Sequence, residues 1–290
     1  MWIWFTLLAA FMQAWRNALQ KQLSLDVPVM GVTLARFLYA GPIAAIYLIV
    51  LYQFYDAPLP TLNVKFVCFI VAASLMQILA TALMVVLFKQ RNYAIGVGLA
   101  KSEAIFAAVL GVIFFASTLS PIGWLGVLVG AFAVFLLSGI KSWRGLSWQT
   151  LAIGSACGAA FALTSLWVRE ASLSLDLAFP LSAAWVLLFV ITLQTIVLLL
   201  WLSFRDRPTL VLLWQKPKLT LLTSLCSCIG SLGWFTAMSL ETVPLVKTLG
   251  QVEVFFTLLI SAFVFKETLK RQDYLGLGLV VVAAVMVLWA

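Results

Sequence analysis

The stretch VPLVKTLGQVEVFFTLLISAFVF, residues Val243–Phe265, decides the fold class of this chain. It is long and apolar enough to cross a bilayer, because a spanning helix needs about 20 predominantly apolar residues. It also carries Lys247, Gln251 and Glu253, and ionisable residues inside a membrane are costly and usually functional. The stretch therefore predicts a membrane helix that holds part of a functional site.

The rest of the chain has the same character. Of its 290 residues, 64% are hydrophobic and 10% charged, whereas a soluble domain usually holds about 25% charged residues. No stretch shows the period-2 alternation of a membrane barrel strand. We expect an all-α membrane protein of ten transmembrane helices, at 2–19, 28–52, 65–88, 94–116, 121–140, 149–168, 177–204, 219–240, 243–265 and 273–290.

Several chemistries are disfavoured by composition. The chain has no histidine, and its four cysteines all lie in apolar runs. Histidine is the commonest metal ligand and general base in proteins, so we expect no metal site, no cofactor and no catalytic residue. The net charge of +8 is interpreted as a report of membrane topology, with no nucleic-acid partner. We expect the chain not to be an enzyme.

A shift of 150 residues aligns two separate regions of the first half with regions of the second half without a gap. LSLD at Leu23–Asp26 recurs at Leu173–Asp176, and LAKSEAIF at Leu99–Phe106 aligns with LGQVEVFF at Leu249–Phe256. We therefore expect two repeats, residues 1–140 and 149–290, joined by a loop at 141–148. Five helices in each half is an odd number, so the second repeat is predicted to be inverted, as in many secondary transporters.

The basic residues predict the orientation. Arg36, Lys101 and Lys247 lie well inside predicted spans. Of the other 15 Lys and Arg residues, only Lys65 and Arg169 fall outside the odd-numbered connections, which join helices 1 and 2, 3 and 4, 5 and 6, 7 and 8, and 9 and 10. The positive-inside rule then places these connections in the cytoplasm and both termini outside. Arg16, near the end of the first helix, is expected to extend toward the lipid headgroups.

Five charged residues are predicted to lie inside the membrane. Glu103 and Glu253 occupy equivalent repeat positions near mid-depth, and they are accompanied by Arg36, Lys101 and Lys247. Either these charges form ion pairs that lock the bundle, or they bind substrate and protons. The predicted substrate-binding residues are Arg36, Lys101, Glu103, Lys247, Gln251, Glu253 and Trp15, with Glu103 and Glu253 as candidates for proton coupling.

Two further motifs carry a family resemblance. VPLVKTLGQVEVFFTLLISAFVFKETLKRQDYLGLGLVV at Val243–Val281, and LARFLYAGP at Leu34–Pro42, resemble the drug/metabolite transporter superfamily, specifically its ten-helix members with two EamA-type domains. The resemblance implies a basket of helices around a central cavity that moves small metabolites without ATP.

Together these features predict a secondary active transporter of the cell (inner) membrane. Its substrate is expected to be a small polar or zwitterionic metabolite, with amino acids the leading class, export the favoured direction and alternating access the mechanism. The protein is expected to act as a monomer or homodimer. The main alternative is a flippase or transporter for anionic lipid or a lipid-linked sugar. A non-transporting membrane subunit and a membrane enzyme are the remaining alternatives.

Overall fold

The chain folds as a bundle of helices. The computed structural model describes residues 1–89, 99–115, 117–137, 147–264 and 271–289, and within these ranges there is no strand. Six helical segments there are long and apolar enough to span a membrane, and three shorter apolar helices accompany them. The predicted all-α, multi-pass membrane class is confirmed.

The helices of the two halves have related bounds. The first half contains α1 (Trp2–Leu23), α2 (Val29–Ala35), α3 (Ala40–Phe54), α4 (Val64–Lys89), α6 (Glu103–Phe114) and α7 (Pro121–Leu137). The second contains α8 (Trp148–Leu173), α9 (Leu181–Arg205), α10 (Arg207–Gln215), α11 (Pro217–Leu240), α12 (Val243–Leu249), the 3-10 turn η2 (Gly250–Val252), α13 (Glu253–Val264) and α14 (Arg271–Leu288). Both bounds of α13 lie 150 residues after those of α6, and α8 ends 150 residues after α1.

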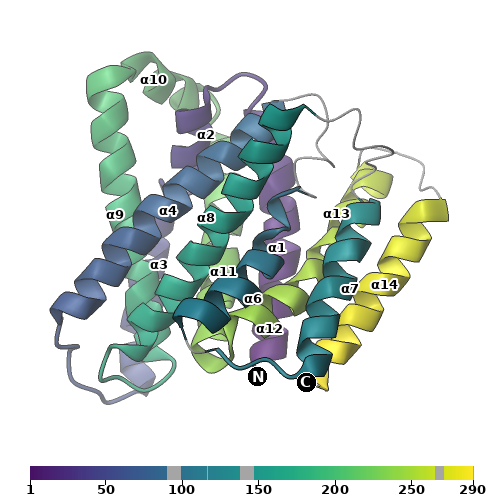
Figure 1. Cartoon of the computed structure of the whole chain (residues 1–290). Helices are drawn as coiled ribbons and strands as arrows, with labels where there is room; N and C mark the ends of the chain where they lie inside the picture. Colours follow the sequence, from purple (N-terminus) through teal and green to yellow (C-terminus); the bar gives the residue numbers. More distant parts are fainter. Residues whose placement is uncertain (90–98, 116, 138–146, 265–270, 290) are drawn as a thin grey trace.

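Helices of the first half pack against helices of the second. The closest pairs are α1 with α11, α4 with α8, and α7 with α14 (Figure 1). Gly233 shows how close α1 and α11 approach, since a Cβ atom there would lie 2.7 Å from the backbone oxygen of Phe5. Both termini lie at the end of the bundle opposite α10 (Figure 1).

The helix predicted at residues 28–52 is divided. α2 ends at Ala35, residues 36–39 form a turn, and α3 begins at Ala40. Polar side chains from distant helices satisfy the interrupted backbone: Ser224 Oγ accepts from the Tyr39 N–H at 2.9 Å, and Thr195 Oγ1 donates to the Phe37 carbonyl at 3.1 Å. Irregular backbone at membrane depth is tolerated where protein surrounds it in this way.

The two helices that carry the glutamates are also interrupted. Residues 243–265 were expected to form one helix, but α12 gives way to η2 before α13 begins at Glu253. In the described part of residues 94–116, Lys101 and Ser102 form a turn and α6 begins at Glu103. Each glutamate is therefore the first residue of a helix, where the helix dipole stabilises a negative charge.

Two segments between predicted helices, at 205–218 and 141–148, can be compared with the structure. Residues 205–218 were expected to form a loop, but they contain the helix α10, which begins at Arg207 with Pro208 in its first turn. Proline is favoured there because its fixed φ suits the start of a helix. The predicted loop at 141–148 lies outside the described residues except for Ser147, whose Oγ caps α8, and Trp148.

Candidate functional site

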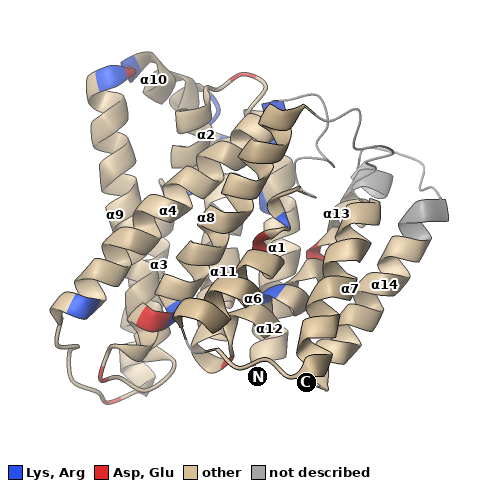
Figure 2. Ribbon diagram, in the orientation of Figure 1, with Lys and Arg blue, Asp and Glu red and all other residues tan. Residues whose placement is uncertain are grey.

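A narrow cavity lies inside the bundle, between helices of both halves. Its volume, measured by the space open to the centre of a water molecule, is about 20 Å³, which is room for about one or two waters. Figure 2 shows acidic and basic residues at mid-height near α1, α6 and α13, among helices that are otherwise uncharged there. Four charged side chains line the cavity: Arg36, Lys101, Glu103 and Lys247.

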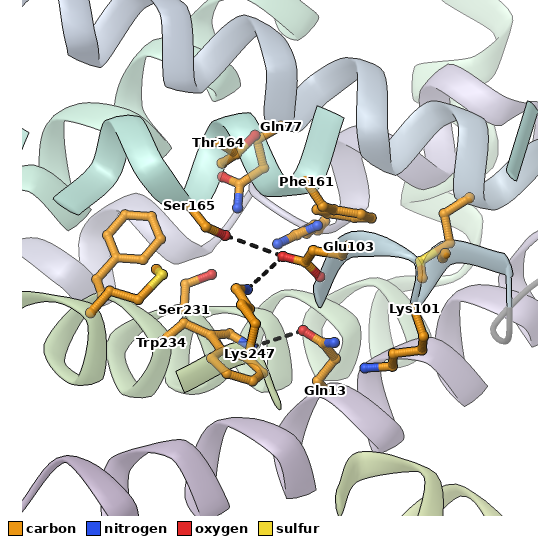
Figure 3. A pocket seen from close by; sticks show the side chains of 15 residues that line it. Gln13, Gln77, Lys101, Glu103, Phe161, Thr164, Ser165, Ser231, Trp234 and Lys247 are labelled. Carbon is orange, nitrogen blue, oxygen red and sulfur yellow. Dashed lines mark hydrogen bonds and ion pairs between the residues drawn. The ribbon is translucent and has the colours of Figure 1, made fainter. Parts of the chain in front are cut away.

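Glu103 forms the centre of the cavity wall. Its Oε1 lies 2.7 Å from Lys247 Nζ and accepts a hydrogen bond of 3.2 Å from Ser165 Oγ (Figure 3). The Lys247 ammonium also lies over the ring of Trp234, 4.2 Å from the centroid. Aromatic faces attract cations, so Lys247 is held by a carboxylate and a ring together.

Glu253 has a different environment from its repeat counterpart. Its side chain is fully buried and does not line the cavity. It forms an ion pair with Lys101, accepts a hydrogen bond from Gln13 Nε2, and accepts another from Asn17 Nδ2 at 2.7 Å. A buried charged group has to be paired and hydrogen-bonded, and these three partners meet that requirement for Glu253. Glu253 is thus enclosed by protein, whereas Glu103 faces the cavity.

The two ion pairs cross between the halves of the chain. Lys101 and Glu103 are two residues apart, yet Lys101 binds Glu253 and Glu103 binds Lys247. Figure 3 shows the side chains of Lys101 and Glu103 pointing in different directions. Both pairs therefore connect α6 and the turn before it with the α12–α13 segment.

Arg36 differs from the two lysines because no carboxylate of the described residues lies within ion-pair distance of it. Its Nη1 donates to Thr81 Oγ1 at 2.7 Å and its Nε to Ser227 Oγ at 3.1 Å. The guanidinium also lies 5.8 Å from the ring centroid of Phe161. Arg36 occupies the turn between α2 and α3 and is only 2% exposed. The hydrogen bonds of this guanidinium therefore go to hydroxyl groups, while the Glu103 carboxylate acts on its charge from beyond ion-pair distance.

Three expectations about individual residues need correction or comment. Arg16 was expected to extend toward the headgroups, but it is 1% exposed, and its Nη2 donates to Asn17 Oδ1 at 2.9 Å. Trp15 is half-buried and is not among the residues that line the cavity, and neither is Gln251. Asn17 explains the burial of Arg16, because its amide links the guanidinium to Glu253.

Several site residues were missed by sequence reasoning. Gln13 accepts from Trp234 Nε1 at 2.8 Å while its own amide donates to Glu253, so it connects the cavity wall to the enclosed carboxylate. The spacing of Gln13 and Asn17 was a usable signal, since residues four apart share a helix face. No group of three or more Cys, Asp or Glu side chains converges within the described ranges to form a metal site.

Comparisons with known proteins address the fold and the family of the chain. A solved structure, described only as the crystal structure of a protein, aligns with 98% of this chain and 98% of its own at a TM-score of 0.73 and 15% identity, which shows a shared fold. No curated protein matches the chain significantly in sequence. The long apolar helices define a multi-pass membrane protein. Residues 147–289 match the EamA-like transporter family, so the chain carries this family's domain in its second half, and the family implies a membrane transporter of small molecules.

Proposed function

We propose that the protein is a secondary active transporter of small zwitterionic metabolites, with amino acids the leading class. The observation that carries the proposal is the pairing pattern in the cavity: Arg36 has no carboxylate within ion-pair distance among the described residues, while the Glu103 carboxylate is held by an ammonium. An amino acid presents a carboxylate and an ammonium, which are the two groups that complement these positions.

The carboxylate of the substrate would bind Arg36. Thr81 and Ser227 hold two of the guanidinium N–H groups, which fixes its plane and leaves the others for an incoming anion. Arginine binds carboxylates through two parallel hydrogen bonds, which adds geometric selectivity. A neutral solute would leave this buried charge without a partner, at a cost in free energy.

The ammonium of the substrate would replace Lys247 at Glu103. The two groups carry the same charge and the same three donors, so the exchange leaves the charge balance of the site unchanged. Released from Glu103, the Lys247 ammonium still has the Trp234 ring beside it. Such an exchange needs little cavity volume at the start, which fits the narrow cavity of the present conformation.

We assign proton coupling to Glu103 and a locking role to Glu253. A coupling carboxylate has to exchange protons with water, and Glu103 lines the cavity whereas Glu253 does not. Protonation of Glu103 would weaken its bond to Lys247 and so break one of the two ion pairs that connect the halves. Glu253 would have to give up its partners on α1 as well as Lys101 before it took a proton.

Alternating access would move one five-helix half against the other. The 150-residue register of the helix bounds supports two equivalent halves, and an inverted arrangement would place the substrate at their interface. The interrupted helices at Arg36, Glu103 and Glu253 surround that interface, as discontinuous helices do in transporters. With the basic connections in the cytoplasm, both termini face outward across the inner membrane, and export is the direction we propose.

Transport by purified protein in liposomes tests the proposal. Uptake of radiolabelled amino acids is measured with and without a pH gradient, for wild type, Arg36→Gln and Glu103→Gln. We expect Arg36→Gln and Glu103→Gln each to abolish uptake, because each removes a charge that binds the amino acid. Unchanged uptake in both variants, still dependent on the gradient, would contradict the assignment of both residues.

A groove on the bundle favours lipid transport as the second candidate. It measures about 320 Å³, is almost wholly apolar, and lies between α3 and α9 with Leu38, two residues after Arg36, in its lining. An acyl chain in this groove would place an anionic headgroup near Arg36. Thermal stabilisation by anionic lipid, together with none by any amino acid, would favour this candidate over the first.

A further inference from the structure

Gln251 is the most unusual buried polar residue of the site region. It lies in η2 and is 1% exposed, and neither its Oε1 nor its Nε2 has a hydrogen-bond partner. A buried amide left unsatisfied costs free energy that an apolar side chain of the same shape would avoid. Such a group calls for an explanation, and a second conformation in which it is satisfied provides one.

The repeat register indicates where that partner lies. Position 251 corresponds to position 101, and Lys101 crosses to the other half to bind Glu253. Glu253 in turn corresponds to Glu103. If the two halves exchange conformations, the contact between Lys101 and Glu253 is replaced by the equivalent contact between Gln251 and Glu103.

We infer that Gln251 is a positioning residue that takes over Glu103 when Lys247 releases it. This inference rests on the proposed function, because it requires two conformations related by the repeat. In the alternate conformation the Gln251 amide would donate to the Glu103 carboxylate, so the free carboxylate would not remain buried alone. The Gln251 amide would then lack a partner in the present conformation because its partner, Glu103, is bound to Lys247.

The local backbone allows this movement. A 3-10 segment within a helix often marks a hinge, and η2 separates α12 from α13. Its first residue, Gly250, lies against Trp234 of the cavity wall, since a Cβ there would be 2.2 Å from the Trp234 ring. A substrate that displaces Trp234 would therefore act directly on the segment that carries Gln251.

The position of Gln251 in the present conformation depends on Gly130 of α7. A Cβ atom at Gly130 would lie 2.0 Å from Gln251 Oε1. That oxygen is at the far end of a flexible side chain, so Gly130→Ala would displace the amide rather than the backbone. Gly130→Ala should favour the alternate conformation, whereas Gln251→Met, which keeps the shape and removes the amide, should favour the present one.

Cysteine accessibility tests the inference without any knowledge of the substrate. The native cysteines are replaced, and Ser231→Cys introduces one cysteine on the cavity wall. This cysteine is then labelled with a membrane-impermeant maleimide in right-side-out and in inside-out vesicles. We expect Gln251→Met and Gly130→Ala to change the ratio of labelling from the two faces in opposite directions. An unchanged ratio in both variants would overturn the inference.

A matched control removes a second buried amide. Gln20 of α1 is fully buried, and its two amide atoms likewise lack partners. Both Gln20→Met and Gln251→Met should raise the unfolding temperature by about 2–4 °C or more, but only Gln251→Met should reduce transport, by at least about tenfold. Wild-type transport by Gln251→Met would refute the inference. Labelling of wild type from one face only, whatever solute is added, would instead refute alternating access itself.

Discussion

Replacing Glu253 by glutamine removes the negative charge at the centre of the enclosed network. The Lys101 ammonium, whose side chain is 8% exposed, would then lose its counterion inside the bundle. Breaking a buried ion pair by removing one partner typically costs about 3–5 kcal/mol, because the other charge stays buried. At about 2–3 °C per kcal/mol for a chain of this size, the unfolding temperature should fall by roughly 6–15 °C.

A double-mutant cycle separates the pair from its surroundings. Lys101→Met added to Glu253→Gln removes both charges, so the double variant should recover most of the lost stability and give a coupling free energy of at least about 2 kcal/mol. Unfolding is followed in detergent by far-ultraviolet circular dichroism at one fixed heating rate. Additive losses, or a loss below about 1 kcal/mol in Glu253→Gln alone, would refute the locking role of Glu253.

The chain provides a matched control for this experiment. Asp26 and Lys216 form another ion pair between the halves, but their side chains are 56% and 35% exposed. Exposed pairs contribute about 0–1 kcal/mol, because water screens them and ordering the side chains costs entropy. Asp26→Asn should therefore leave the unfolding temperature almost unchanged. A loss as large as that of Glu253→Gln would show that burial does not set the cost.

Three further predictions concern the site and the packing. Arg36→Lys keeps the charge but loses the planar fork that binds a carboxylate, so amino-acid binding measured by thermal shift should weaken at least about tenfold. Glu103→Gln should retain ligand-induced stabilisation by a carboxylate that lacks an amine, but lose that by the matching amino acid. Gly233→Ala would place a methyl group 2.7 Å from the Phe5 backbone oxygen and should cost about 1–3 kcal/mol on unfolding. Gly278→Ala, where nothing lies within 4 Å, should be neutral or slightly stabilising.

The sequence was sufficient for the fold class and for the buried charges. Hydrophobic runs of about 20 residues have few other solutions in a membrane, which is why most predicted helices agree with the observed ones to within a few residues. Glu103 and Glu253 were found because acidic residues in apolar runs are rare. The structure places each at the first residue of a helix, α6 and α13, and these two helices have bounds 150 residues apart.

The helix interruptions depend on more than local sequence. Gly41 and Pro42 follow the turn at 36–39, and a proline removes the hydrogen bond to the carbonyl four residues earlier, so the local sequence favours a break but does not fix the path of the turn. The turn is stabilised by hydroxyl groups from Ser224 and Thr195, nearly 200 and 160 residues away in sequence. The same holds for Arg16, whose burial depends on Asn17 reaching Glu253. These outcomes are set by tertiary contacts, which a hydropathy pattern does not contain.

The halves share a scaffold but not the partners of their glutamates, and this difference bears on the transport cycle. Lys101 corresponds to Gln251, and Lys247 corresponds to Val97. In the proposed exchange, Lys101 would lose its ion pair with Glu253, and Glu103 would gain only a hydrogen bond from the neutral Gln251 amide. The protein without substrate should therefore favour the present conformation. A ligand shifts such an equilibrium only by the difference in its affinity for the two states. A substrate carboxylate that binds Arg36 more tightly in the alternate conformation would supply that difference, which makes an anionic group a requirement for the conformational change as well as for binding.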